Sequence, residues 1–434
     1  MRGDKRVTTD FLKEIVQQNR AGGSRGIYSV CSAHRLVIEA SMQQAKSDGS
    51  PLLVEATCNQ VNHEGGYTGM TPSDFCKYVL DIAKEVGFSQ EQLILGGDHL
   101  GPNPWTDLPA AQAMEAAKKM VADYVSAGFS KIHLDASMAC ADDVEPLADE
   151  VIAQRATILC AAGEAAVSDK NAAPMYIIGT EVPVPGGAQE DLHELATTNI
   201  DDLKQTIKTH KAKFSENGLQ DAWDRVIGVV VQPGVEFDHA MVIGYQSEKA
   251  QTLSKTILDF DNLVYEAHST DYQTETALTN LVNDHFAILK VGPGLTYAAR
   301  EALFALSYIE QEWITNKPLS NLRQVLEERM LENPKNWAKY YTGTEQEQAF
   351  ARKYSFSDRS RYYWADPIVD QSVQTLINNL TEQPAPMTLL SQFMPLQYAA
   401  FRAGQLNNDP LSLIRHWIQE VVSTYARASG LAVK

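Results

Sequence analysis

The chain has 434 residues, of which 44% are hydrophobic and 21% are charged. This is an ordinary globular composition, and it excludes the collagen-like, disordered and disulfide-scaffold classes. Acidic residues outnumber basic ones by 55 to 37, which gives a net charge of −18 with histidine neutral. A field of this sign repels nucleic acid and acidic membranes, so we expect neither as a partner, and a phosphorylated substrate would need a local anion site.

Three features of the sequence favour a cytoplasmic protein. The first 20 residues are charged throughout and lack the apolar segment of a signal peptide. No apolar run reaches the ~18 to 20 residues that a membrane-spanning helix needs. The five cysteines are odd in number and show no CxxC spacing, which is typical of reduced thiols.

Short apolar runs rich in β-branched residues alternate with longer helical patterns in the first two thirds of the chain. The runs that we expect to be strands are Gly26–Ser32, Leu52–Asn59, Leu93–Leu100, Lys131–Ser137, Met175–Pro183, Val226–Gln232, Leu263–Ser269 and Phe286–Gly292. Eight strand–helix units predict an α/β fold, a (β/α)8 TIM barrel, over residues 1–306.

After Arg300 the alternation stops, and we expect a helical extension over residues 307–434, packed on the barrel. Predicted helices include Leu319–Leu331, Ile368–Leu380 and Asp409–Ala428. The stretch Tyr354–Trp364 places two arginines, Arg359 and Arg361, among aromatic residues. This composition is typical either of a packed helical layer or of an interface, and we expect the extension to contribute an interface with these arginines and Trp364.

Polar residues follow the strands at their carboxyl ends, where a TIM barrel carries its chemistry. Asp98 and His99 end the third strand, and flanking glycines permit the bend that both side chains need to reach one substrate. The histidine is a candidate metal ligand and the aspartate a candidate base. Glu181 and His268 end the fifth and seventh strands, so with His99 they would suit a catalytic Zn²⁺ or a harder divalent ion.

The mid-strand histidine, His133, is interpreted as a packed core or inter-strand histidine. Lys290 has two interpretations: a lysine paired with an acid on a neighbouring strand, or a lysine of lowered pKa that forms a Schiff base with a ketone. We expect the paired form, because a metal site makes the Schiff base redundant.

Two glycine-containing turns are candidate phosphate sites. Gly292 and Gly294 lie between the eighth strand and a helix, where backbone N–H groups can bind an anion, and Ser269 is placed to assist. Gly66 lies in a second glycine-rich loop after the second strand. Neither turn matches a Walker A pattern, so a kinase is disfavoured.

The chain closely resembles the companion, non-catalytic subunits of tagatose-1,6-bisphosphate aldolase, a family formerly labelled tagatose-6-phosphate kinases. The motifs that carry the resemblance are IYSVCSAH, EATCNQVN, GGYTGMTP, LILGGDHLGPN, KIHLDAS, GTEVPVPGGAQED, VVVQPGVEFDH, YEAHSTDYQT, FAILKVGPGLT and YSFSDRSRYYW. These subunits are in turn similar to the metal-dependent, class II ketose-bisphosphate aldolases.

The resemblance implies a class II metal site with one departure. Asp98-His99, Glu181 with Gly186-Gly187, and His268 match the aldolase pattern, whereas the sixth strand ends in Gln232 in place of a ligand histidine. Gln232 would then be an amide ligand or no ligand, which shifts the preference from Zn²⁺ toward Mn²⁺ or Mg²⁺. His239 is a possible replacement.

The expected catalytic residues are Asp98, Asp135 and Glu181. The expected metal ligands are His99, Glu181, Gln232 and His268. The expected substrate- or phosphate-binding residues are Asn59, Gly66, Ser269, Gly292, Gly294, Arg359 and Arg361.

Two functions follow from the resemblance and the retained site residues. In the first, the chain is a component of tagatose-1,6-bisphosphate aldolase in galactitol or N-acetylgalactosamine catabolism. It would bind a ketohexose phosphate and associate with a class II aldolase subunit, with itself, or with both. In the second, it is a free-standing metal-dependent 4-epimerase that interconverts tagatose and fructose phosphates by retro-aldol and aldol steps. The sequence leaves open whether the isolated chain is catalytic.

Overall fold

Eight parallel strands close into a barrel in the computed structural model, which describes residues 5–180 and 195–432. The strands, in chain order, are β1 (Ile27–Cys31), β2 (Leu52–Thr57), β3 (Leu93–Leu100), β4 (Lys131–Leu134), β5 (Met175–Ile178), β6 (Val226–Val231), β9 (Val264–Ala267) and β10 (Ile288–Val291). Around the barrel they follow the order β1-β10-β9-β6-β5-β4-β3-β2. Each lies within one of the runs expected from the sequence, so the predicted TIM barrel is confirmed.

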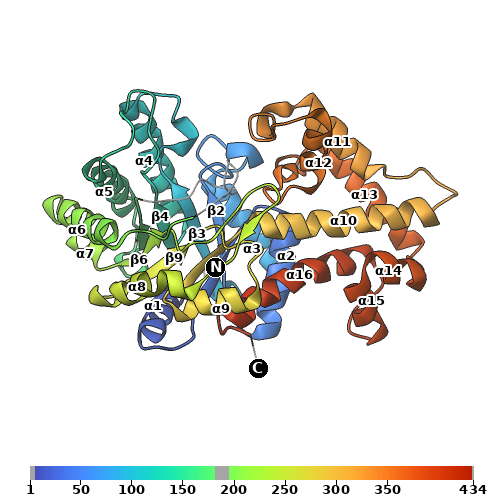
Figure 1. Ribbon diagram of the computed structural model, residues 1–434, viewed down its shortest axis with the longest axis horizontal. Helices are drawn as coiled ribbons and strands as arrows, with labels where there is room; N and C mark the ends of the chain where they lie inside the picture. Colours follow the sequence, from blue (N-terminus) through green and yellow to red (C-terminus); the bar gives the residue numbers. More distant parts are fainter. Residues whose placement is uncertain (1–4, 181–194, 433–434) are drawn as a thin grey trace.

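Helices between the strands form the outer layer of the barrel (Figure 1). They are α2 (Arg35–Asp48), α3 (Pro72–Val86), α4 (Ala110–Ala127), α5 (Asp149–Ala165), α6 (Ile200–Glu216), α7 (Gln220–Trp223), α8 (Ser247–Thr256), α9 (Glu275–Asn283) and α10 (Pro293–Trp313). An additional helix, α1 (Lys5–Arg20), precedes the first strand, and a short hairpin of β7 (Glu236–Phe237) and β8 (Val242–Ile243) follows β6.

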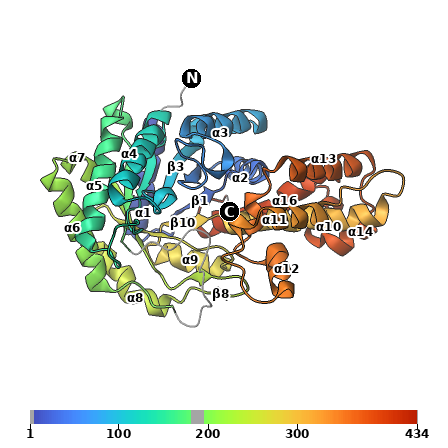
Figure 2. The same cartoon turned by 90° about the horizontal axis from the view of Figure 1, so that it is seen from above.

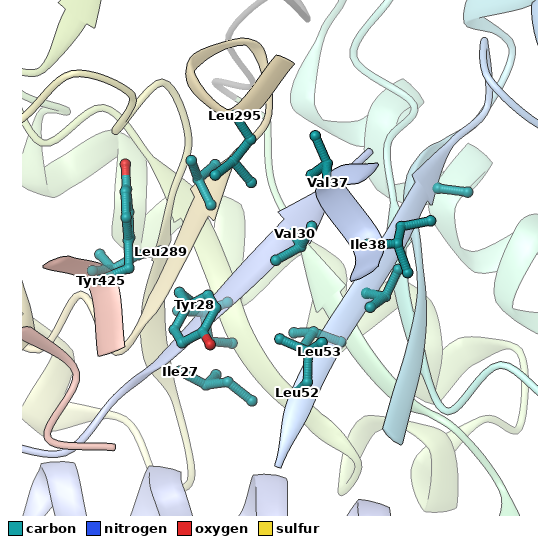
Figure 3. Packing of buried hydrophobic residues seen from close by; sticks show 14 of the residues in the cluster. Ile27, Tyr28, Val30, Val37, Ile38, Leu52, Leu53, Leu289, Leu295 and Tyr425 are labelled. Carbon is teal, nitrogen blue, oxygen red and sulfur yellow. The ribbon is translucent and has the colours of Figure 1, made fainter. Parts of the chain in front are cut away.

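The strands are rich in apolar residues because both of their faces are covered, although several also carry a buried charged residue. Figure 3 shows Tyr28 and Val30 of β1 packed among residues of α2, β2 and β10, with Tyr425 approaching from the C-terminal helix. The rings of Tyr28 and Tyr425 lie 6.3 Å apart. The apolar side chains therefore place the barrel core beneath the polar carboxyl ends of the strands.

The C-terminal region is a set of helices that extends from one side of the barrel (Figures 1 and 2). They are α11 (Leu322–Glu332), α12 (Glu345–Tyr354), α13 (Pro367–Glu382), α14 (Met387–Phe393), α15 (Pro395–Arg402) and α16 (Pro410–Ala428). The three helices expected from the sequence correspond to α11, α13 and α16. Helix α10 continues across positions 306 and 307, so a single helix joins the barrel to the extension.

The last helix returns to the barrel. It packs on α2, α9 and α10, and the Tyr425 hydroxyl donates a hydrogen bond of 2.6 Å to the carbonyl of Thr270. The backbone N–H of Gly26, directly before β1, donates to the carbonyl of Ser429 at 3.0 Å. The extension is thus fixed against the barrel at both of its ends.

None of the five cysteines, all of which lie in the described ranges, forms a disulfide bond. Across the ranges that the structure describes, no helix combines the length and apolarity needed to cross a membrane.

Candidate functional site

A bend at the end of β3 brings Asp98 and His99 to the same side. His99 has a left-handed backbone with φ of 49°, and the pairing of β3 with β4 shifts register between Gly97 and Leu100. Positive φ at a residue other than glycine is strained and is concentrated at functional sites. As the sequence predicted, Asp98 and His99 both line one cavity as a result.

Glycine is required just beyond this bend. A Cβ atom at Gly101 would lie 1.5 Å from the carbonyl oxygen of Asp135, so any larger residue would push β3 away from the end of β4.

Asp135 holds the His99 ring. Nδ1 of His99 lies 2.8 Å from Oδ2 of Asp135, and the Ser137 hydroxyl donates to Oδ1 of the same carboxylate at 2.6 Å. Burial alone would lower the pKa of His99, but the charges of Asp98 and Asp135 raise it to about 9. Asp135 is itself buried, so it acts as a positioning residue for His99.

Two further imidazoles lie beside His99. Its ring meets that of His268 edge-on with centroids 4.8 Å apart, and the ring of His133 lies 5.2 Å from that of His268. Nδ1 of His133 is 3.0 Å from Oδ1 of Asp98, and Nε2 of His268 is 3.0 Å from Oε1 of Glu266. Burial alone would raise the pKa of Asp98, but the neighbouring histidines hold it far below its usual range.

A metal-binding arrangement exists among these groups. Asp98, His133, Glu266 and His268, which we call the donor set, each offer one ligand atom, and these atoms lie within 4.8 Å of one another. Nε2 of His133 is buried and has no hydrogen-bond partner among residues 5–180 and 195–432. An orphaned imidazole nitrogen beside two carboxylates is what a divalent cation would satisfy.

The interpretation of His133 as a packed core or inter-strand histidine is only partly right. Its Nδ1 does contact Asp98 of the neighbouring strand, but its Nε2 has no partner among the described residues and it lies in a polar cluster inside the barrel. The sequence does contain a pattern that indicates this cluster. Lys131, His133 and Asp135 alternate along β4 and the residue after it, and Glu266 and His268 are spaced in the same way at the end of β9. Residues at this spacing point to the same face of a strand. Polar residues at successive inward positions indicate a buried polar site.

Beneath the donor set lies a network of buried charges. Nζ of Lys131 is 2.7 Å from Oε1 of Glu55 and 2.6 Å from Oε2 of Glu266. Lys290 forms an ion pair with Glu55, and its Nζ lies 3.0 Å from Oδ1 of Asp98. We call Glu55, Asp98, Lys131, Glu266 and Lys290 the charge network. Isolated charges are very costly to bury, so these groups require one another.

The charge network has an excess of one negative charge, because three carboxylates face two ammonium groups. His99 and Asp135 form a separate pair that adds no net charge. A divalent cation at the donor set would more than offset this excess and would lie beside two carboxylates, so the residues present fit such an ion in ligand type.

Lys290 is the paired lysine that the sequence favoured. Its ammonium lies against Glu55 and Asp98, and burial lowers its pKa to about 8. Whether it reacts with a ketone stays a prediction.

Two further expected metal ligands are Glu181 and Gln232. Glu181, with Gly186 and Gly187, falls outside the described residues. The amide oxygen of Gln232 accepts hydrogen bonds from the backbone N–H groups of Gly234 and Val235, at 2.8 and 3.1 Å, and so holds its own turn.

His239 does not join the donor set either. Its Nε2 lies 3.0 Å from the carbonyl oxygen of Tyr340, and its Nδ1 lies 3.2 Å from the Ser355 hydroxyl. It therefore connects the loop after β6 to the extension.

A carboxylate already binds the predicted phosphate turn at the start of α10. The backbone N–H groups of Gly292 and Gly294 donate to Oδ1 of Asp271 at 2.9 and 2.8 Å. Asp271 is buried, which raises its pKa to about 6. At the other glycine loop, a Cβ on Gly66 would lie 2.4 Å from the carbonyl oxygen of Gln60, so Gly66 is required by close packing.

The cavity above the donor set has a volume of about 540 Å³. Strand ends and their loops provide the cavity floor, which contains Asp98, His99, His268 and Lys290, with Asn59 and Ser269 among the other lining residues. The extension provides what we call the cavity wall, which consists of Arg361, Tyr362 and Trp364.

Arg359 lines neither the cavity floor nor the cavity wall. Its guanidinium stacks 3.0 Å above the centroid of the Tyr340 ring and donates to the carbonyl of Asn336. Arg359 and Trp364 are buried within this chain and Arg361 faces the cavity. The expected interface role of Arg359, Arg361 and Trp364 stays a prediction.

Solved structures of three other proteins are similar to this chain. A protein of Sinorhizobium meliloti 1021, described as a probable tagatose 6 phosphate kinase, is 46% identical, with a TM-score of 0.85 over 93% of this chain and 100% of that chain. A fructuronate-tagaturonate epimerase from Cohnella laeviribosi is 14% identical, with a TM-score of 0.49 over 94% of this chain and 81% of its own. The fructose-bisphosphate aldolase of Campylobacter jejuni is 13% identical, with a TM-score of 0.46 over 92% of this chain and 96% of its own.

A protein-family model matches residues 12–430 of this chain, a range that includes every strand of the barrel and the extension to the end of α16. The chain belongs to the D-tagatose-1,6-bisphosphate aldolase subunit GatZ/KbaZ-like family.

Proposed function

We propose that this chain is a cytoplasmic component of tagatose-1,6-bisphosphate aldolase whose barrel binds a divalent cation and a ketohexose phosphate. Membership of the family supports the role as an aldolase subunit. The observation that carries the proposal is the buried donor set, which lies where the cavity meets the strand ends.

Asp98, His133, Glu266 and His268 would hold the cation, with His99 beside them. Two imidazoles and two carboxylates suit Zn²⁺ or Mn²⁺ better than Mg²⁺, which prefers oxygen ligands alone. When bound, a divalent cation polarises the carbonyl group of a ketose and stabilises negative charge on its oxygen.

The side chains of the cavity floor have separate roles in this proposal. His99 is held in one orientation by Asp135 and can donate a hydrogen bond to a sugar oxygen. Asp98 is ionised because its pKa is held low, so it can accept a hydrogen bond from a substrate hydroxyl. As the ionised carboxylate that lines the cavity, it is the candidate acceptor of that hydroxyl's proton. Lys290 balances the charge of Asp98 and Glu55.

The same Asp98 favours a second candidate function, a free-standing 4-epimerase. Asp98 would accept the proton of the C4 hydroxyl while the C3–C4 bond breaks, which leaves an aldehyde at C4 and moves the bonding electron pair toward the C2 carbonyl oxygen. Rotation of the aldehyde, re-formation of the bond on its opposite face and return of the proton from Asp98 would invert C4.

Metal analysis of purified variants tests the proposal. Protein loaded with Zn²⁺ or Mn²⁺ should retain one ion per chain, and His133→Ala or His268→Ala should lose it. His210→Ala is the matched control, because His210 is equally buried but lies on α6 with its Nδ1 2.9 Å from the Thr206 carbonyl oxygen. Equal metal content in all four proteins would contradict the donor set.

A coupled assay separates the two candidate functions. The isolated, metal-loaded chain is given tagatose 6-phosphate and tagatose 1,6-bisphosphate, alone and with a cognate class II aldolase subunit. Turnover by the isolated chain supports the epimerase. Turnover that requires the second subunit, together with co-purification of the two chains, supports the component role.

A further inference from the structure

The wall of the cavity carries an arginine that forms no ion pair among the described residues. The guanidinium of Arg361 donates to the backbone carbonyls of Ser357 and Asp358 and, at 2.9 Å, to the hydroxyl of Tyr362. In the part of the chain that the structure describes, no carboxylate forms an ion pair with it. Arg361 thus keeps its full positive charge beside the cavity of a protein whose net charge is −18.

An unused hydrogen-bond donor lies on the same wall. Trp364 lines the cavity and is only 8% exposed, and its indole N–H is buried without an acceptor among the described residues. An indole nitrogen can only donate, and buried donors are almost always satisfied in native proteins. The missing acceptor therefore points to a ligand.

His34 adds a third polar group at this place. It precedes α2, lines the cavity, and its ring lies edge-on to Trp364 with centroids 6.2 Å apart. Its Nδ1 is also buried without a partner within the described ranges. Burial lowers the pKa of His34 to about 4, so the ring is neutral at pH 7 and either nitrogen can carry the donating proton.

The glycine turn at the start of α10 is less available to an anion. Both of its N–H groups donate to Asp271, and a second anion there would have to displace a buried carboxylate or lie against its charge.

We infer that Arg361 and Trp364 bind the phosphate group of the sugar, so that the extension, and not the glycine turn, supplies the anion site. The inference rests on the proposed function for the identity of the ligand. A planar guanidinium and an indole N–H are donors without acceptor capacity, and phosphate oxygens are acceptors at neutral pH.

This arrangement sets the orientation of the substrate. The carbonyl end of the sugar lies toward the donor set and its phosphate toward the extension. A sugar without phosphate gains nothing from Arg361, so the wall makes the cavity selective for phosphorylated ketoses.

Binding of inorganic phosphate and of tagatose 6-phosphate, measured by calorimetry on the full-length chain, tests the inference. Arg361→Gln and Trp364→Phe should each weaken both ligands by about tenfold or more, the usual effect of removing a hydrogen bond to a charged group. Binding of unphosphorylated tagatose to the metal-loaded protein should change little.

Two matched controls sit in the same extension. Arg359→Gln removes a guanidinium that stacks on Tyr340, and Trp337→Phe removes an indole N–H that donates to the Met330 carbonyl at 2.6 Å. Neither residue lines the cavity, so both variants should bind phosphate as the unmodified protein does if they remain folded by circular dichroism.

Further variants distinguish this inference from the proposed function. His268→Ala should lose the metal and keep phosphate binding, whereas Arg361→Gln should do the reverse. If both wall variants bind phosphate normally while Asp271→Asn binds it more tightly, the glycine turn is the anion site and the inference is wrong. If phosphate binding depends on the wall but no metal binds, the inference stands and the proposed function fails.

Discussion

In the charge network below the cavity each charged group has a partner of opposite charge, whereas the cavity wall carries a guanidinium without an ion pair and an indole N–H without an acceptor among the described residues. Lys131 lies between Glu55 and Glu266, and Lys290 contacts Glu55 and Asp98. The wall offers the guanidinium of Arg361 and the indole N–H of Trp364. The barrel floor thus has a surplus of negative charge and the extension a surplus of donors. The difference indicates that the two regions bind opposite ends of one ligand, a cation with a carbonyl group below and an anion above.

The largest effect is expected on the reaction rate, when the candidate base Asp98 at the cavity floor is replaced. If the isolated chain is a 4-epimerase, Asp98→Asn should lower its rate by about 10² to 10⁴-fold, because the amide keeps size and hydrogen bonding but cannot accept the proton. Conversion of tagatose 6-phosphate to fructose 6-phosphate is the measurement, and EDTA should also abolish it. Because the C3–C4 bond is cleaved, no solvent deuterium should enter C4, and its incorporation would exclude the retro-aldol route.

The second largest effect should come from leaving the floor with unpaired charge. Lys131→Met removes the ammonium between two buried carboxylates, and loss of one partner in such a pair costs about 3–5 kcal/mol in the free energy of unfolding. Urea unfolding measures it. The control is Lys118→Met, which breaks an exposed pair with Glu115 and should change stability little. Similar midpoints for both variants would show that the charge network is not coupled as described.

A smaller effect concerns Asp271, whose carboxylate lies between floor and wall. Burial raises the pKa of Asp271 to about 6 in the folded chain, against roughly 3.9 in an unfolded chain. The folded state therefore binds this proton more tightly. The stability that this group contributes is fully present below about pH 4 and is lost as pH rises through 6.

Asp271→Asn should remove this component, because the amide oxygen can still accept from Gly292 and Gly294 but does not ionise. Between about pH 4 and pH 7, the variant should lose roughly 2–3 kcal/mol less stability than the unmodified chain. Urea unfolding at several pH values compares the two proteins. Parallel pH profiles would mean that Asp271 titrates at its ordinary pKa.

The last prediction is that borohydride treatment does not modify Lys290. Lys290 should form no Schiff base, because its ammonium is held by Glu55 and Asp98. Borohydride reduction in the presence of tagatose or fructose phosphate should leave the mass of the chain unchanged. A stable adduct mapped to Lys290 would assign the carbonyl chemistry to the lysine in place of a metal.

Much of the fold was predictable because each strand is a short β-branched run that ends in polar residues. The bend at Asp98-His99 was also predictable, since glycines flank it. The donor set was found only in part. Of the expected ligands, only His268 belongs to the donor set: His99 lies beside it, and Asp98 was expected as a base. His133 and Glu266 lie inside strands, where a single polar residue is easily taken for a packed one.

Other features needed the tertiary structure. Nothing near Gly292 indicates that a carboxylate 21 positions earlier takes its N–H group. The two arginines of YSFSDRSRYYW have the same sequence context, yet Arg359 stacks inside the extension and Arg361 reaches the cavity. Such a division depends on how helices far apart in the chain pack together, and local patterns do not encode it.

The hydrogen bond from the Gly26 N–H to the Ser429 carbonyl has a consequence for the order in which the chain folds. Beside it, the Arg25 side chain donates to the carbonyl of Gly430, a residue 405 positions later. Contacts of such sequence separation form late in folding. Until the end of α16 has been synthesised, the residues directly before β1 therefore lack these two partners.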